Sequence, residues 1–226
     1  MSRYMNLIGQ NAKKASLEKV NTSVKNKILK RYALLLDKEK NYIFKANTKD
    51  IKFALKKGLK NSLIDRLAID QKKLDIIKNS INKIIKLKDP VDNTLEKWSR
   101  PNGLKIKRVS IPIGVIGVIY ESRPNVTSDV ASLCFKSGNA VILKGGSEAI
   151  NTNKILAKLF RKALNENKVN ENFIQFVDSK DRKRVDFMLS KMKDYIDVII
   201  PRGGKNLVKK VKEFSAVPII GHLEGL

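Results

Sequence analysis

Three short segments of the sequence combine basic side chains with glycines or helix-capping residues, and each follows a run of apolar residues. They are residues 121–125 (ESRPN), 144–147 (KGGS) and 201–205 (PRGGK). Glycines let backbone N–H groups approach an anion, while Lys and Arg balance its charge. In a parallel sheet such loops gather beyond the carboxyl ends of the strands. Together they predict a site for a nucleotide or another phosphorylated ligand.

Each segment taken alone also has an ordinary structural interpretation. Asn125 can cap a helix as readily as it can present its amide to a ligand. Residues 144–147 can form a tight turn that carries a solvated lysine. Residues 201–205 match neither of the two common glycine-rich nucleotide motifs. The evidence for a ligand site is therefore the expected presence of three such loops on one edge of the sheet.

The chain contains one cysteine and one histidine. Cys134 falls in an expected helix, in line with Val130 and Leu133, so we interpret it as a small buried apolar side chain. His222 has no Ser or Cys placed by the sequence to activate. One Cys and one His can form neither a Cys/His zinc site nor an internal disulfide. We therefore predict no metal site and no catalytic triad.

The second half of the sequence alternates short apolar runs with helical patterns. The expected strands are 113–120, 140–143, 173–177, 196–200 and 217–220, and the expected helices are 126–136, 148–165, 181–193 and 205–214. Alternation of buried strands with helices is typical of βαβ units around a parallel sheet covered on both faces. The predicted fold class is α/β, with a doubly wound, Rossmann-type core over residues 111–226.

Residues 1–92 have the apolar spacing of amphipathic helices. One helix is expected over 22–44. Asn47, with Asp50 three residues later, is interpreted as the cap of the next helix, which stops at Gly58. Ser62 and Asp70 are the expected caps of a short turn and a longer helix. We interpret all of these helices as scaffold.

A β-hairpin is expected between these two parts, over residues 95–110 within a segment 93–110. Asn102-Gly103 separates two extended runs, which is the strongest short-range hairpin signal. A polar two-stranded ribbon is only marginally stable by itself. We therefore expect the hairpin to lie against another part of this chain or against a second subunit.

The charge balance is strongly basic, with 47 Lys and Arg against 22 Asp and Glu and a net charge of +25. The positive electrostatic field of such a chain attracts polyanions, and nucleic acid is the obvious candidate for a binding partner. The basic residues are nevertheless spread along the chain, and most are Lys, which lacks the bidentate fork that reads bases. Lys, Asn and Ile are all encoded by AT-rich codons. A solvated Lys-rich surface is the favoured interpretation, and a nucleic-acid footprint is the alternative.

The sequence contains no membrane-spanning pattern. No apolar run approaches the roughly 18 residues of a transmembrane helix, and residues 1–14 lack the apolar core of a signal peptide. We expect a cytoplasmic protein with no membrane partner.

The chain also resembles a known enzyme family in three blocks. These are residues 114–150 (GVIGVIYESRPNVTSDVASLCFKSGNAVILKGGSEAI), 197–211 (DVIIPRGGKNLVKKV) and 217–225 (VPIIGHLEG). In the same order they resemble blocks of the γ-glutamyl phosphate reductases, also called glutamate-5-semialdehyde dehydrogenases, within the aldehyde dehydrogenase superfamily. The resemblance implies a Rossmann-type cofactor domain, an oligomerisation hairpin and a separate catalytic domain.

The resemblance further implies the second step of proline biosynthesis from glutamate. In that reaction γ-glutamyl 5-phosphate is reduced with NADPH to glutamate 5-semialdehyde, and phosphate is released. The implied course is attack by a Cys thiolate, loss of phosphate to give a thioester, and hydride transfer.

Individual residues take implied roles by their match to the family motifs. Asn125 matches the Asn whose amide stabilises the oxyanion, and Lys144 matches the Lys that contacts the adenosine ribose and suits a 2′-phosphate. The remaining cofactor-binding residues are Gly145 and Gly146 in the loop after Lys144, and Arg202, Gly203, Gly204 and Lys205 beside the pyrophosphate. Ser122 and Arg123 are implied substrate contacts.

The chain also departs from the family pattern. Family members are much longer, and their catalytic Cys lies beyond the position matching Leu226, so Cys134 is not that residue. We therefore expect an N-terminal half that binds NADPH but is inactive alone. A separately encoded catalytic half and a truncated gene product are both compatible with this. A nucleic-acid-binding protein on a dehydrogenase half-fold and a non-catalytic subunit that pairs through residues 95–110 are the alternatives.

Overall fold

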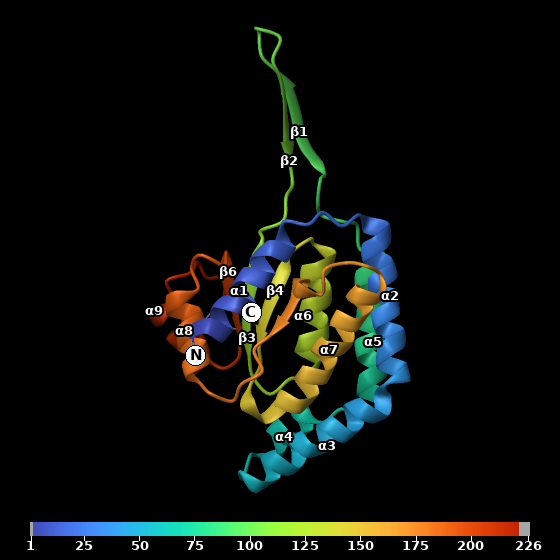
Figure 1. The fold of residues 1–226 in the computed structure, drawn as a ribbon, viewed down its shortest axis with the longest axis vertical. Coiled ribbons are helices and arrows are strands. Elements are labelled where there is room, and N and C mark those ends of the chain that lie inside the picture. Colours follow the sequence, from blue (N-terminus) through green and yellow to red (C-terminus); the bar gives the residue numbers. More distant parts are fainter. Residues whose placement is uncertain (1, 222–226) are drawn as a thin grey trace.

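The computed structural model describes residues 2–221 and consists of a helical layer, a parallel sheet and a long hairpin (Figure 1). The N-terminal helices are α1 (Ser2–Ser16), α2 (Thr22–Lys38), α3 (Lys40–Lys56), α4 (Asn61–Leu67) and α5 (Gln71–Lys86). The predicted cap of α5 is present, because the Asp70 side chain accepts a hydrogen bond from the Lys73 backbone N–H.

Three predictions for this helical part are wrong. The helix expected over 22–44 is two helices that meet at Glu39. Asn47 and Asp50 do not cap a helix of their own, since both are buried in the middle of α3. The cap position of α4 is Lys60 rather than Ser62, and it makes no side-chain cap hydrogen bond. Five polar residues, 37–41 (DKEKN), interrupt the apolar spacing at this junction, and the expected single helix overlooked that break.

The main sheet has four parallel strands in the order β5-β4-β3-β6. They are β3 (Val115–Tyr120), β4 (Ala140–Lys144), β5 (Ile174–Phe176) and β6 (Val198–Arg202). The strand predicted at 217–220 is reduced to a single parallel bridge between Ile199 and Ile219. Pro218 has no N–H to donate to the ladder, which limits the pairing at this edge.

Helices cover both faces of the sheet, which confirms the predicted doubly wound α/β core. In Figure 1, α6 (Asn125–Lys136) and α7 (Ile150–Glu166) lie on one side of the strands, and α1, α8 (Lys183–Lys191) and α9 (Lys205–Phe214) lie on the other. Short 3-10 turns precede α7 (Ser147–Ala149) and β5 (Glu171–Phe173). Phe160 of α7 packs against α2 and α6. Its ring centroid lies 4.5 Å from that of Tyr32 and 5.8 Å from that of Phe135.

The predicted hairpin forms from β1 (Thr94–Ser99) and β2 (Lys105–Val109) and projects away from the body (Figure 1). Gly103 adopts φ +84° in its turn, a conformation that favours glycine. Every residue of β1 is exposed. The hairpin therefore does not lie against another part of the described chain, which removes the first of the two expected arrangements.

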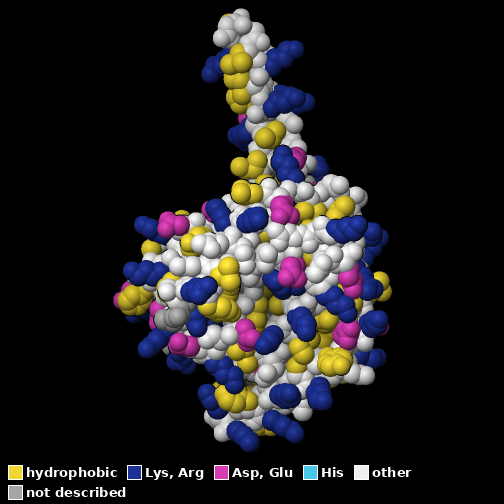
Figure 2. Space-filling view, viewed as in Figure 1, with side chains coloured by type: hydrophobic (Ala, Val, Ile, Leu, Met, Phe, Trp, Pro, Cys, Tyr) yellow, Lys and Arg dark blue, Asp and Glu magenta, His cyan; other side chains and the backbone are white. Residues whose placement is uncertain are grey.

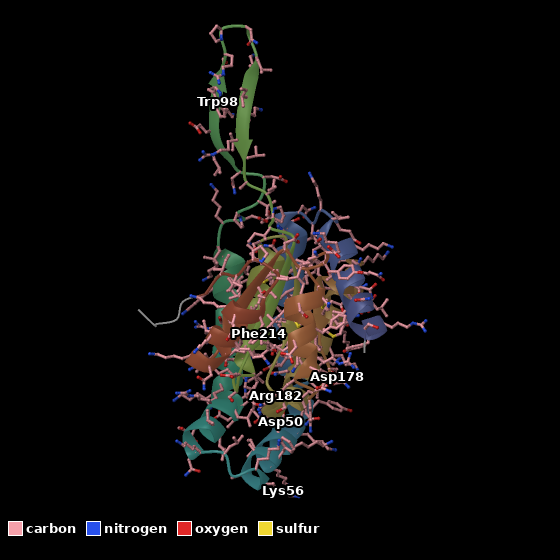
Figure 3. The ribbon with its side chains drawn as sticks, turned by 90° about the vertical axis from the view of Figure 1, so that its left-hand side faces the viewer. Asp50, Lys56, Trp98, Asp178, Arg182 and Phe214 are labelled. Carbon is pink, nitrogen blue, oxygen red and sulfur yellow. The ribbon has the colours of Figure 1, made fainter. Side chains whose placement is uncertain are left out.

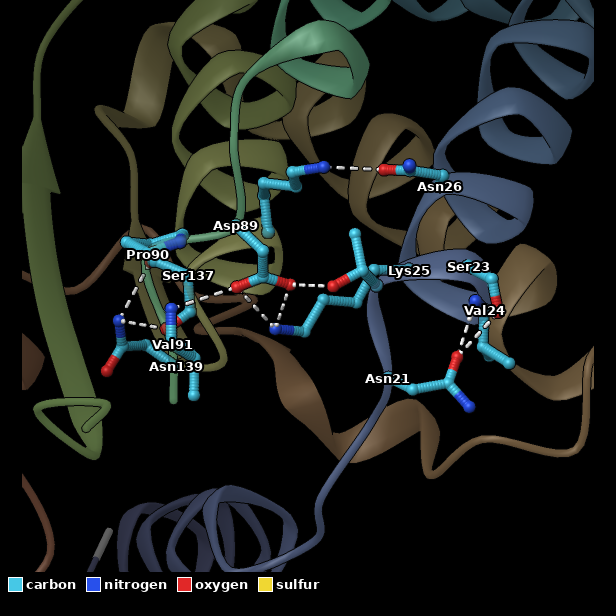
Figure 4. Close-up of polar contacts among 12 residues, drawn as sticks. Asn21, Ser23, Val24, Lys25, Asn26, Asp89, Pro90, Val91, Ser137 and Asn139 are labelled. Carbon is cyan, nitrogen blue, oxygen red and sulfur yellow. Dashed lines mark hydrogen bonds and ion pairs between the residues drawn. The ribbon is translucent and has the colours of Figure 1, made fainter. Parts of the chain in front are cut away.

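The base of the hairpin is held by a buried ion pair (Figure 4). Lys25 Nζ lies 2.9 Å from Asp89 Oδ2, and only 3% of the Lys25 side chain is exposed. The same carboxylate accepts hydrogen bonds from the Thr22 hydroxyl and the Val91 backbone N–H. These contacts hold the segment between α5 and β1 on the body.

Basic side chains are scattered over the hairpin and the body in Figure 2, with acidic side chains among them. On the face shown they form no single large cluster. Within residues 2–221, no helix is long and apolar enough to cross a membrane.

Candidate functional site

Strands β3 and β6 are neighbours in the sheet, although β4 and β5 lie between them in the sequence. Tyr120 at the end of β3 pairs with Arg202 at the end of β6. The strand order reverses here, and ligands of open α/β sheets bind in the crevice at such a point. The loops after β3 and β6 therefore meet at the edge where a nucleotide site is expected.

A pocket of about 420 Å³ lies between these two loops. Five sequence-predicted residues line it: Ser122, Arg123, Arg202, Gly203 and Gly204. Leu63, Arg66 and Glu121 complete the lining. Two of the three predicted loops are thus brought into one pocket. Lys205 begins α9 directly after this lining and is exposed.

The third predicted loop lies beside this pocket without lining it. Lys144 in β4 pairs with Ile119 in β3, so β3 lies between Lys144 and β6. Its side chain is buried, and Nζ donates a hydrogen bond to the Gly145 carbonyl at 2.8 Å. Burial lowers the pKa of Lys144, and the carboxylates of Glu148 and Asp181 oppose this. The Lys144 ammonium is therefore a buried cation with few partners.

Gly145 leaves space for a polar group that has no protein partner. A Cβ at Gly145 would lie 2.3 Å from Asn153 Nδ2 and 3.1 Å from the Tyr120 ring. Asn153 Oδ1 accepts a hydrogen bond from the Thr127 hydroxyl, but the buried Nδ2 has no partner among the described residues. A buried donor without an acceptor is costly. Asn153 is fully buried, so this donor lies behind the glycine loop.

A carboxylate occupies the N-terminal end of α9. Glu121 Oε2 accepts a hydrogen bond from the Gly204 backbone N–H at 3.0 Å. A Cβ at Gly203 would lie 2.6 Å from the same oxygen. The first N–H groups of a helix attract anions, and here they hold one supplied by the chain itself. The α9 N-terminus therefore already binds an anionic group, the carboxylate of Glu121.

Ser122 is held by a second carboxylate. Its backbone N–H and its hydroxyl each donate to Glu148 Oε1 at 2.8 Å. Neither Glu121 nor Glu148 is among the site residues predicted from the sequence. The signal was present, since one follows a buried strand directly and the other lies in the first turn before α7. As the structure stands, the Ser122 hydroxyl donates within the protein.

Asn125 is the first residue of α6, and the cap position is Pro124. The alternative interpretation of Asn125 as a helix cap is therefore wrong. Its amide is exposed and donates a hydrogen bond to Asp129 Oδ2 at 3.2 Å. Asn125 and Arg123 line a second, larger pocket, of about 560 Å³, between the loop after β3 and helices α4 and α5.

A buried polar frame holds the elements behind the site. Asp50 of α3 accepts hydrogen bonds from the Thr152 backbone N–H at 2.8 Å and from the Thr152 hydroxyl at 2.6 Å. It also accepts from Asn151. Asn47 binds the Leu67 carbonyl and the Ile69 N–H. These two residues thus cap α7 and fix the α4–α5 turn.

Cys134 is buried as predicted, and burial raises the pKa of its thiol to about 12. A thiol that stays protonated at neutral pH is a poor nucleophile. His222 lies outside the described residues. Among residues 2–221 there is no group of three or more His, Cys, Asp or Glu side chains that could hold a metal ion.

Sequence comparison identifies curated relatives over nearly the whole chain. No protein-family model matches it. The γ-glutamyl phosphate reductase of Persephonella marina is 45% identical over 210 residues, which are 93% of this chain and 47% of that protein. The chain thus spans about half the length of the curated relatives it matches.

The γ-glutamyl phosphate reductases are also among the solved structures that this chain resembles. The γ-glutamyl phosphate reductase of Thermotoga maritima superposes with a TM-score of 0.92 and 39% identity, over 95% of this chain and 52% of that one. The reductase of Saccharomyces cerevisiae gives 0.88 and 32%, over 98% and 56%. An engineered glycolyl-CoA reductase with bound NADP⁺ shares the fold at a TM-score of 0.68 and 16% identity, over 96% of this chain and 46% of that one. The chain is therefore a homologue of the N-terminal half of the γ-glutamyl phosphate reductases.

Proposed function

We propose that this chain is the cofactor-binding half of a γ-glutamyl phosphate reductase and that it binds NADPH at the carboxyl edge of its sheet. The observation that carries this proposal is the pocket at the β3–β6 junction, where Arg123, Arg202, Gly203 and Gly204 come together. The names of the homologues support the choice of family.

Each loop has a distinct part in holding the cofactor. The N–H groups at the start of α9, with Arg202 and Lys205, would bind the pyrophosphate. Lys144 would bind the adenosine ribose or its 2′-phosphate, which favours NADPH over NADH. When bound, NADPH supplies the hydride for the reduction. Since Glu121 now accepts the Gly204 N–H, it has to release that position for the pyrophosphate.

Asn125 is the residue proposed to act on the substrate carbonyl. Its amide is exposed at the start of α6, where an N–H donor can stabilise a developing oxyanion. Ser122 and Arg123 are proposed substrate contacts. Arg123 is exposed, whereas Ser122 has to exchange its bond to Glu148.

The complete reaction converts γ-glutamyl 5-phosphate to glutamate 5-semialdehyde and phosphate, in proline biosynthesis. Cys134 does not provide the nucleophile, because its thiol is buried and its pKa is raised to about 12. We propose that turnover requires the part of the reductase that this chain does not match, supplied as a catalytic half. The exposed hairpin is proposed to pair with a second copy of the chain.

A fluorescence titration with NADPH, and NADH in parallel, tests cofactor binding at physiological salt. We expect saturable binding that is tighter for NADPH. A folded chain that binds neither nucleotide contradicts the proposal. As a second test, glutamate semialdehyde, NADP⁺ and phosphate are supplied to the chain alone, and no NADPH is expected to form. Turnover by the pure chain contradicts the requirement for a second half.

A further inference from the structure

The larger pocket, of about 560 Å³, shares two walls with the proposed cofactor pocket. Arg66 of α4 and Arg123 of the loop after β3 line both. The rest of the larger pocket is formed by α5 and by the first turns of α6, including Asn125 and Asp129. A ligand in it would therefore lie directly beside a cofactor bound at the β3–β6 junction.

One side of this pocket carries a carboxylate that the protein leaves incompletely partnered. Asp129 Oδ1 is buried and has no hydrogen-bond partner among the described residues, while Oδ2 accepts one from Asn125. Burial raises the pKa of Asp129, and the nearby Ser80 hydroxyl and Asn125 amide oppose this. Asp129 is half-buried, and its unpartnered oxygen is a strong acceptor for a cationic group.

The opposite charge is present on the same pocket. Arg66 and Arg123 are exposed, and within residues 2–221 neither guanidinium takes part in a hydrogen bond or an ion pair. Arg is well suited to bind a carboxylate through two parallel hydrogen bonds. The pocket therefore offers unpaired groups of both signs, which have not neutralised one another.

The walls of the pocket are held in place before any ligand binds. Lys73 of α5 donates to the carbonyls of Asp65 and Ala68, which fixes the turn between α4 and α5. Asn47 binds the Leu67 carbonyl and the Ile69 N–H in the same turn. A preformed pocket loses little ordering entropy when it binds a small polar molecule.

We propose that this pocket binds the zwitterionic α-amino acid head of the substrate, with Asp129 accepting the α-ammonium group and Arg66 and Arg123 binding the α-carboxylate. The proposal rests on the proposed function, since that function supplies a γ-glutamyl substrate. Asp129 and Asn125 are one helical turn apart and face each other. Three C–C bonds of about 1.5 Å join the α carbon of a glutamyl group to the carbonyl carbon of its γ-carboxyl group. A glutamyl chain can thus reach Asp129 while its γ-carbonyl is beside Asn125.

Calorimetric titration with L-glutamate, glutarate and 4-aminobutyrate separates the two halves of this recognition. Glutarate lacks the ammonium group, and 4-aminobutyrate lacks the α-carboxylate. We expect L-glutamate to bind about tenfold more tightly than either. Non-specific attraction to a chain of net charge +25 would instead make glutarate bind more tightly than L-glutamate, because glutarate carries the larger negative charge. Equal binding, tighter glutarate binding, or no binding of L-glutamate overturns the proposal.

Two variants assign the contacts. Asp129→Asn should remove the preference for L-glutamate over glutarate, and Arg66→Gln should remove the preference over 4-aminobutyrate. Asp186→Asn and Arg108→Gln are matched controls, because these side chains form exposed ion pairs on α8 and on the hairpin. Both controls should retain the wild-type order of affinities. A control that abolishes the preference as strongly as its test variant overturns the assignment.

NADPH titration of the same samples distinguishes this proposal from the proposed function. If NADPH binds and L-glutamate does not, the amino acid pocket is wrong and the cofactor site stands. If L-glutamate binds with the expected preference and NADPH does not, the proposed cofactor function fails alone. If a folded chain binds neither, both fail.

Discussion

The carboxyl edge of the sheet and the hairpin lie at opposite ends of the molecule and differ in how their side chains are partnered. Figure 3 shows Trp98 far out on the hairpin and Asp50 near the other end. At the sheet edge, Asp50, Glu121 and Glu148 accept hydrogen bonds from distant segments. On the hairpin, Trp98 and Leu95 are 40% and 58% exposed. The sheet edge is thus held by contacts within the chain, whereas the side chains of the hairpin are left exposed.

The hairpin nevertheless has a defined surface of its own. Trp98 pairs with Ile106 across the two strands, and Glu96 forms an ion pair with Arg108 on the same face. Lys97 and Lys107 oppose each other on the other face, where like charges repel. The Trp98 face is therefore the one expected to contact a second copy.

The largest expected effect is on stability at the sheet edge. Asp50→Ala removes a buried acceptor from the N-terminus of α7 and leaves its donors unpaired. We expect the free energy of unfolding to fall by about 3 kcal/mol, measured by urea denaturation. Asp186→Ala, which breaks an exposed ion pair with Lys210, should cost less than about 1 kcal/mol. Equal losses in the two variants would contradict the capping role of Asp50.

Asp50 also marks a limit of sequence-based prediction. The alternation of apolar runs and helices was enough to predict the parallel sheet and its covered faces. An Asn and an Asp three residues apart look like a local helix cap, but the partner of Asp50 is Thr152, 102 residues away. Glu121 likewise contacts Gly204 across 83 residues. Local motifs were therefore enough to predict the three loops at the sheet edge. The contacts between segments distant in the sequence could be identified only from the structure.

The next effect concerns the hairpin. If a second copy covers the Trp98 face, Trp98→Ala should weaken association by about 2 kcal/mol, which is about thirtyfold in the dissociation constant. Analytical ultracentrifugation measures the change. Lys97→Ala, on the opposite face, is the control and should leave association nearly unchanged. A chain that is monomeric at every accessible concentration contradicts the pairing.

A smaller effect is expected from the glycines of the cofactor pocket. A Cβ at Gly203 would lie 2.6 Å from Glu121 Oε2, whereas a Cβ at Gly204 would be 3.9 Å away. The Glu121 carboxylate can move away from such a Cβ, but the Cβ at Gly203 would also stand where the pyrophosphate has to approach the backbone. Gly203→Ala should therefore raise the NADPH dissociation constant about tenfold, or about 1.4 kcal/mol. Gly204→Ala should change it by less than about threefold. Fluorescence titration compares the two variants, and an equal response would show that the close approach at Gly203 is unimportant.

The smallest effect is a pH dependence at Asp129. Burial raises the pKa of this carboxyl, so the folded state keeps its proton to higher pH than the unfolded state. Stability then falls as pH rises through the folded-state pKa. Asp129→Asn removes this loss, and we expect it to stabilise the chain by about 1 kcal/mol at pH 7 and by almost nothing near pH 4. Urea denaturation at both pH values tests this, and a difference independent of pH contradicts it. The polar groups around the pocket are Asp65, Arg66, Lys73, Ser80, Arg123 and Asn125.

Hydrogen–deuterium exchange with and without saturating NADPH tests most directly whether the carboxyl edge of the sheet is the nucleotide site. We predict slower exchange in residues 121–125, 144–147 and 202–206, and unchanged exchange in the hairpin over 94–109. Protection confined to the hairpin or to the N-terminal helices, or no protection while NADPH is bound, would contradict the assignment of the nucleotide site to this edge.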